Sequence, residues 1–159
     1  MASGHEMAMG LRAAYWSMHR QTNAHLAPLG ATAEQFVVLA LLAAEDGITQ
    51  QELGRRATSD PNTIRAILVL LEKRGLVSRR RHPTDGRARC VTLTRKGKQA
   101  YEKWQAHIEP VQDRLLSVVP NDEADDLVGY LHDISEAMAE RNTRAGADRS
   151  VTSDRSVDS

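Results

Sequence analysis

Ten basic side chains are concentrated in residues 73–98, a stretch that holds a single acid, Asp85. The stretch carries a formal charge of +9 in a chain whose net charge is zero, so the rest of the sequence sums to −9. Guanidinium and ammonium groups at this density neutralise phosphates, which indicates a local site for a polyanion. A solvated charged face is the alternative. The ten residues are Lys73, Arg74, Arg79, Arg80, Arg81, Arg87, Arg89, Arg95, Lys96 and Lys98.

Other residues that could perform chemistry are sparse. The single cysteine, Cys90, lies among arginines that favour a thiolate, but it falls within a predicted strand, where a structural role is the alternative. His132 and Glu136 are four residues apart and could share a helix face, yet no cluster of Cys and His has metal-site spacing. The sequence contains no glycine-rich phosphate loop and no nucleophile–base signature. We therefore expect no enzyme, no cofactor and no metal.

The composition is typical of one globular domain. Of 159 residues, 41% are hydrophobic and 26% charged, which is enough to bury a core without disulfides. The longest apolar run, residues 36–44, is far shorter than the roughly 20 residues of a membrane span. The N-terminus lacks the pattern of a secretory signal, and one cysteine cannot form an internal disulfide. We expect a cytoplasmic protein without membrane contact.

Hydrophobic spacing predicts the helices that position these groups. Apolar residues recur every three or four positions over 6–28, which predicts a first helix, and the same spacing follows the capping pattern Thr32-x-x-Gln35. A short third helix is expected after a second such pattern, Thr49-x-x-Glu52.

A fourth helix is expected to begin near Pro61, which fits a first helical turn, with Ser59 or Asp60 as its cap. Two strands, 76–81 and 89–94, then flank a turn-rich tip. Their order after the three helices is that of a winged helix-turn-helix, in which the fourth helix fits the major groove of DNA and the ribbon reaches the backbone. The fold class is therefore mainly α with a small β-wing.

The terminal helices predict an assembly. A DNA-binding lobe of residues 32–94 has too little surface to cover the apolar faces of the first helix (region 1–31) and of two later helices (region 95–141). We expect these helices to form dimerisation regions, the alternative being a monomer whose ends fold onto its own core. Region 142–159 is polar and is expected to be a disordered tail.

Three spaced motifs carry a family resemblance. They are the run LEKRGLV at 71–77, Asp85-x-Arg87, and Val91-x-Leu93-Thr94-x-x-Gly97. Together they resemble the MarR family of bacterial transcription regulators, over roughly residues 6–140. The resemblance implies a homodimeric winged helix-turn-helix repressor, or sometimes an activator, that binds pseudo-palindromic operators in double-stranded DNA. It also implies frequent release by a small aromatic or phenolic ligand, although some relatives respond to oxidants or metal ions.

The resemblance implies DNA contacts from the fourth helix and the ribbon. Open N–H groups near Asn62 and Thr63 are expected to bind a phosphate. Arg65 is the candidate for reading a base, because arginine can bond a guanine edge with two donors. Arg87 matches the arginine that relatives insert into the minor groove, and Asp85 matches the residue that holds the wing in shape. The complete DNA-binding set is Ser59, Asn62, Thr63, Arg65, Ala66, Arg79, Arg81, Arg87 and Arg89.

Some positions depart from the family pattern. Gly86 stands where relatives often carry a basic residue, and Arg65 stands where they often carry threonine. Val69 and Leu70 are apolar where relatives are often polar, so they either pack inward or form an exposed patch.

A ligand site and two other function classes stay open. In relatives the pocket lies between the dimer helices and the DNA-binding lobe, where the aromatic or polar candidates are Tyr15, Trp16, His19 and Phe36. Core packing explains these four residues equally well. The alternatives to a DNA-binding repressor are a winged-helix adaptor that binds protein, a regulator that responds to a metal or an oxidant, and a hydrolase or transferase.

Overall fold

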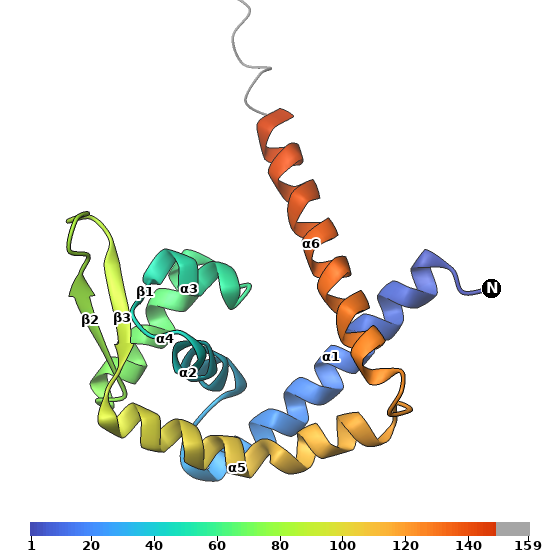
Figure 1. Ribbon diagram of the computed structural model, residues 1–159, viewed down its shortest axis with the longest axis horizontal. Coiled ribbons are helices and arrows are strands. Elements are labelled where there is room, and N and C mark those ends of the chain that lie inside the picture. Colours follow the sequence, from blue (N-terminus) through green and yellow to red (C-terminus); the bar gives the residue numbers. More distant parts are fainter. Residues whose placement is uncertain (149–159) are drawn as a thin grey trace, which may run out of the picture. The chain divides into compact units, whose positions relative to one another are not determined.

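The computed structural model describes residues 1–148 and is mainly helical with one small sheet, which confirms the predicted fold class. The described contacts divide into two compact units, Met1–Gln112 and one that begins at Asp113. The elements, in chain order (Figure 1), are α1 (Gly4–Leu26), the short 3-10 helix η1 (Ala27–Leu29), α2 (Ala33–Ala44), β1 (Ile48–Thr49), α3 (Gln50–Arg56), α4 (Pro61–Lys73), β2 (Val77–Arg81), β3 (Arg89–Leu93), α5 (Arg95–Ser117) and α6 (Ala124–Asp148).

Polar caps set where the helices begin. The Ser3 hydroxyl accepts the Glu6 N–H while the Glu6 carboxylate accepts the Ser3 N–H, so α1 starts at Gly4, earlier than its apolar spacing indicated. Thr32 accepts the Gln35 N–H at 3.2 Å and Thr49 accepts the Glu52 N–H at 3.1 Å. Both patterns therefore cap helices as expected.

The sheet has three strands in the order β1-β3-β2, so the prediction of a two-stranded ribbon missed the strand β1. β1 and β2 both pair antiparallel with β3, with Ile48 opposite Val91 and Val77 opposite Leu93. The Asp46 carboxylate accepts the Leu93 N–H at 2.9 Å and fixes the turn before β1. A two-residue strand shows no alternation of apolar and polar residues, which is why the sequence pattern missed it.

The core of the first unit lies between α2, α3, α4, the sheet and the first half of α5. Ile64, Leu68 and Leu71 form the buried stripe of α4, as its spacing predicts, and Trp104 of α5 is buried in the same cluster. Each fully buried large aliphatic side chain stabilises the fold by roughly 1.5–3 kcal/mol. This stripe turns the opposite side of α4 toward solvent.

A tight junction joins α4, the sheet and α5. A Cβ on Gly97 would lie 1.9 Å from the carbonyl oxygen of Leu76, so only glycine fits there. Arg74 donates a hydrogen bond of 2.7 Å to the carbonyl of Gly30, and its guanidinium carbon lies 5.3 Å from the ring centroid of Trp104. Arg74 belongs to the basic block, but its contacts are internal to the fold.

The second unit contains α6, which runs through Asp148. Residues 142–148, which were expected to belong to a disordered tail, are helical as part of α6. Residues 149–159 of that predicted tail lie outside the described residues.

No single helix within residues 1–148 is long and apolar enough to cross a membrane. The bent pair Gly4–Leu29 and Ala33–Ala44 passes by length and composition alone, but Val38, Leu39 and Leu42 in its second helix are buried in the core.

Candidate nucleic-acid interface

The N-terminus of α4 is closed by its own cap. One Asp60 carboxylate oxygen accepts the backbone N–H groups of Asn62 at 3.0 Å and Thr63 at 2.9 Å. Hydrogen bonds from the Thr63 hydroxyl and then from its N–H lower the pKa of Asp60 below its ordinary value, so the group stays anionic. The expectation of open N–H groups at Asn62 and Thr63 is therefore wrong. The sequence allowed Ser59 or Asp60 as the cap, and it is Asp60, whose carboxylate accepts the N–H groups that were expected to bind a phosphate.

The outer face of α4 is open to solvent. Arg65 and Ala66 are exposed, whereas Ile64 and Leu68 of the same helix are buried. Leu70 is 50% exposed and Val69 is half-buried, so the departure from the family pattern leaves Leu70 on the surface. Arg65 also lines a groove of about 540 Å³ with Gln50, Glu72, Arg79 and Arg89.

The loop between β2 and β3 is held by local hydrogen bonds. The Asp85 carboxylate accepts the Arg87 N–H at 3.0 Å, and the Asp85 carbonyl accepts the Ala88 N–H at 3.1 Å. His82 Nδ1 accepts the N–H groups of Thr84 at 3.3 Å and Asp85 at 3.2 Å. Asp85 therefore shapes the turn that presents the exposed Arg87 side chain. His82 was not among the residues predicted from sequence, because histidine is not one of the residue types that mark turns.

The arginines of the ribbon differ in what they can contact. Arg81 and Arg89 lie directly opposite each other in the ladder, and both are exposed. Arg79 instead donates to Glu72 of α4 through two hydrogen bonds of 3.2 and 3.1 Å. Those hydrogen bonds hold the pKa of Glu72 below its ordinary value. Arg79 was expected to add a phosphate contact, but here its guanidinium joins β2 to α4.

A second groove, of about 620 Å³, lies between α3, the start of α4 and the wing. It brings together four of the predicted residues, namely Ser59, Asp85, Arg87 and Arg89. It adds Gln50, Gln51 and Arg55 from α3, which sequence reasoning did not assign. The cationic side chains lie on α3 and on the adjacent wing. This arrangement can bind a phosphodiester backbone next to the DNA major groove that α4 would enter.

The four candidate ligand residues do not form one cluster. On α1 the ring centroids of Tyr15, Trp16 and His19 lie 5.4 to 5.6 Å apart, and both Tyr15 and Trp16 are exposed. Phe36 is buried on α2 and stacks on Tyr101 at 5.8 Å. Phe36 is therefore part of the core of the first unit, and Tyr15, Trp16 and His19 remain as an aromatic group on α1.

Residues with other possible chemistry are isolated. Cys90 is half-buried in β3, opposite Arg80. His132 Nδ1 lies 3.8 Å from a carboxylate oxygen of Glu136 on an exposed face of α6. In the part of the chain that the structure describes, no group of three or more His, Cys, Asp or Glu could hold a metal ion.

The sequence has recognisable relatives. The profile of the MarR family matches residues 31–88. An HTH-type transcriptional repressor of Mycobacterium tuberculosis is 32% identical over 97 residues, which cover 61% of this chain and 70% of that protein. The transcriptional regulator HosA of Escherichia coli is 38% identical over 84 residues, which cover 53% of this chain and 59% of HosA.

Solved structures match over most of the chain. The transcriptional repressor CouR bound to a 23-mer DNA duplex has a TM-score of 0.72 at 28% identity and covers 85% of this chain and 99% of CouR. A MarR variant from Escherichia coli complexed with operator DNA has a TM-score of 0.72 at 26% identity and covers 80% and 92%. The regulator PcaV from Streptomyces coelicolor, in complex with its natural ligand, has a TM-score of 0.70 at 25% identity and covers 87% and 99%.

Proposed function

The chain belongs to the MarR family of transcriptional regulators, and we propose that it is a homodimeric repressor of a pseudo-palindromic operator. The observation that carries the proposal is the cross-strand pair Arg81 and Arg89 beside the wing-tip Arg87. Like charges directly opposite each other in a ladder destabilise it, and a phosphate backbone between them relieves that repulsion. CouR and the MarR variant, both solved with DNA and both more than 25% identical to this chain, support DNA as the partner.

The proposed contacts divide into base reading and backbone binding. Arg65 and Ala66, exposed on α4, face the base edges in the major groove, and Arg65 supplies the two donors that guanine accepts. Arg87 enters the minor groove, while Ser59, Arg81 and Arg89 contact phosphates. The Asn62 side chain is exposed at the start of α4 and can reach the backbone or a base.

Two proposed contacts have narrower roles than expected from sequence. The hydroxyl and N–H of Thr63 both donate to Asp60, so Thr63 fixes the start of α4 and has no free donor for a phosphate. Arg79 acts through its pair with Glu72, which keeps the wing beside α4.

The proposed dimer uses the terminal helices. Within the described chain, α1, the C-terminal end of α5 and α6 expose many large apolar side chains, a density typical of an interface. A two-fold dimer would place two α4 helices at half-sites one DNA turn apart. The exposed residues are Met7, Met9, Tyr15, Trp16, Met18, Leu115, Leu116, Val118, Leu127, Val128, Tyr130, Leu131 and Met138. Sedimentation should give twice the 17.6 kDa chain mass at micromolar concentration, and a monomer at that concentration would contradict the dimer.

Release by a small aromatic molecule is the regulatory part of the proposal. It is supported by the group Tyr15, Trp16 and His19 on α1 and by PcaV, a relative solved with its natural ligand. A ligand that prefers a dimer geometry in which the α4 helices miss their half-sites would lower DNA affinity. A thermal-shift screen with aromatic carboxylates should raise the Tm. If no compound across several aromatic classes raises it, the ligand proposal is wrong.

DNA binding itself is tested with labelled duplexes in a salt series. Affinity should fall steeply between about 50 and 200 mM salt, because each neutralised phosphate releases counterions. Arg87→Ala should weaken binding to all sequences, whereas Arg65→Ala should also reduce the preference for a duplex selected from a random pool, by about 1–3 kcal/mol of discrimination. Equal losses on selected and random duplexes would contradict the readout role of Arg65. No duplex affinity at any salt would favour the winged-helix adaptor.

A further inference from the structure

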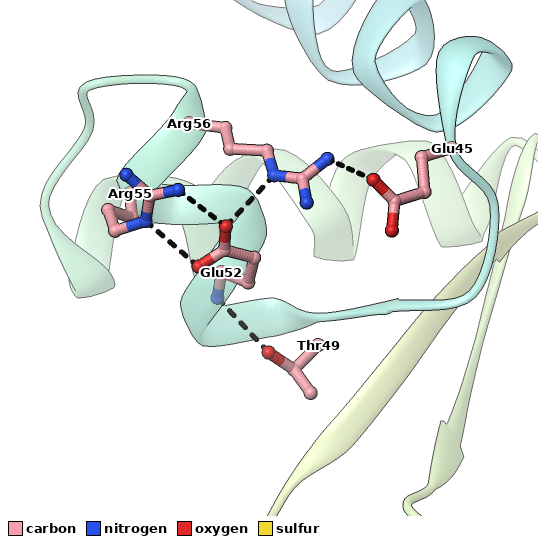
Figure 2. A network of polar contacts seen from close by, with 5 residues as sticks. All are labelled: Glu45, Thr49, Glu52, Arg55 and Arg56. Carbon is pink, nitrogen blue, oxygen red and sulfur yellow. Dashed lines mark hydrogen bonds and ion pairs between the residues drawn. The ribbon is translucent and has the colours of Figure 1, made fainter.

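Two consecutive arginines on α3 share one carboxylate. The Glu52 carboxylate accepts hydrogen bonds from Arg55 Nε at 2.9 Å and Nη2 at 2.6 Å, and from Arg56 Nε at 2.9 Å. Thr49 caps the same helix by accepting the Glu52 N–H (Figure 2). Both guanidiniums are therefore held in defined positions on the first helix of the helix-turn-helix.

The two arginines differ in what lies beyond Glu52. Arg56 continues to Glu45, at the end of α2, with a distance of 2.6 Å from Nη1 to the carboxylate, and its side chain is 31% exposed (Figure 2). The Arg55 side chain is 72% exposed and lines the groove of about 620 Å³ between α3 and the wing. Within the described residues, Arg55 Nη1 makes no hydrogen bond. Arg56 is paired with two carboxylates and is mostly covered, whereas the more exposed Arg55 is paired with Glu52 alone and can donate to a further acceptor.

The groove that Arg55 lines has cations on both walls. Arg87 and Arg89 come from the wing, and Arg55 with Ser59 comes from the helix-turn-helix. Asp85 is the single acid among the lining residues, and its carboxylate already accepts the Arg87 N–H. The three guanidiniums outnumber Asp85 and the Glu52 carboxylate that pairs with Arg55, which leaves an excess of positive charge that suits an anion running along the groove.

We propose that Arg55 contacts a DNA phosphate, so that α3 and the wing grip one backbone strand from opposite walls of this groove. The inference rests on the proposed DNA-binding function and adds a contact to it. The first helix of a helix-turn-helix crosses the DNA backbone, so an exposed cation on α3 is expected to meet a phosphate and not a base edge. The bidentate pair with Glu52 fixes the direction of the guanidinium before DNA arrives.

Arg55→Gln and Arg56→Gln form a matched pair for the test. Both remove one positive charge from the same helix and one partner from the same carboxylate. Affinity for a labelled mixed-sequence duplex is measured by fluorescence anisotropy between about 50 and 200 mM salt. Arg55→Gln should weaken binding about fivefold at the lower salt and reduce the slope of log K against log salt by about 0.9, the value for one phosphate. Arg56→Gln should keep the wild-type slope.

A third variant separates charge from folding. Arg55→Lys keeps the charge and should keep the slope, and circular dichroism melting shows whether each variant is folded at the assay temperature. Equal slopes for wild type and folded Arg55→Gln would overturn the inference, as would an equal slope loss in Arg56→Gln. Arg87→Ala serves as the benchmark. If Arg87→Ala lowers the slope and Arg55→Gln does not, only this inference fails, whereas a wild-type protein without salt-dependent binding would overturn the proposed function as well.

Discussion

Arg79 of β2 and Glu72 of α4 form an ion pair with two hydrogen bonds, of 3.2 and 3.1 Å, that ties the wing to the helix beside it. Both side chains are partly exposed, at 22% for Arg79 and 42% for Glu72, so the pair contributes at most about 1 kcal/mol to stability. Its larger effect is on orientation, because two parallel bonds fix the direction of the guanidinium. The wing and α4 are therefore expected to meet DNA as one rigid surface.

Removing the carboxylate separates orientation from charge. Glu72→Gln frees Arg79 and deletes a negative charge from the groove that also contains Arg65 and Arg89. We expect unfolding by urea to show a loss below about 1 kcal/mol, and duplex affinity at low salt to increase. Arg79→Gln, the control, should lower affinity. If Glu72→Gln instead weakens DNA binding, the loss of a fixed wing orientation lowers the affinity more than the removal of the negative charge raises it.

Gly97 is expected to be the most sensitive glycine of the first unit. Gly97→Ala would place a Cβ 1.9 Å from the Leu76 carbonyl oxygen, and both partners are backbone, so neither can rotate away. We expect a loss of about 3 kcal/mol or more, measured by thermal melting. Gly86→Ala is the matched control, since no atom lies within 4 Å of its added Cβ. A Gly97→Ala protein as stable as Gly86→Ala would contradict the packing at this junction.

The order of elements could be predicted because it depends on local signals. The buried stripe of α4 and the caps Thr32 and Thr49 are visible within a few residues of sequence, since helix periodicity and capping are short-range. The wing was marked by two strands around a turn-rich tip. The third strand, β1, lacked any such signal because two residues carry no period.

The details of the site depend on partners that sequence spacing does not reveal. Arg74 and Arg79 counted toward the basic block, yet Arg74 bonds the carbonyl of Gly30, 44 residues away, and Arg79 bonds Glu72. A tally of charges assigns both to DNA, because which carboxylate or carbonyl captures a guanidinium is decided by tertiary packing. Arg55 was overlooked for the opposite reason, since it lies outside the basic block and reaches the groove only through the angle of α3.

The Glu52 carboxylate makes the α3 network stable at neutral pH. Hydrogen bonds from Arg55 and then Arg56 lower its pKa from 4.5 to about 2. A depressed pKa in the folded state contributes stability that is complete above 4.5 and is lost as pH falls toward 2. NMR titration of the Glu52 side chain should therefore give a midpoint near 2, and Glu52→Gln should reduce the fall in stability across this range. A midpoint near 4.5 would mean that the network does not persist in solution.

The Asp60 cap of α4 places a negative charge at the proposed DNA interface. Serine could cap the helix without that charge. Asp60→Ala removes the acceptor for the Asn62 and Thr63 N–H groups and should cost about 0.5–2 kcal/mol in urea unfolding. Asp60→Ser keeps a capping oxygen, so it should lose much less stability, and without the carboxylate charge the α4 N-terminus repels phosphate less, so duplex affinity should rise at low salt. Because the folded pKa of Asp60 is lowered, its share of stability is present above about 3.8 and lost as pH falls, and Asp60→Ser should lack that acid dependence. Asp60→Ser could instead bind the selected duplex more weakly while its affinity for random duplexes is unchanged. In that case the Asp60 carboxylate reads a base, as an acceptor for a cytosine amino group, and contributes to specificity.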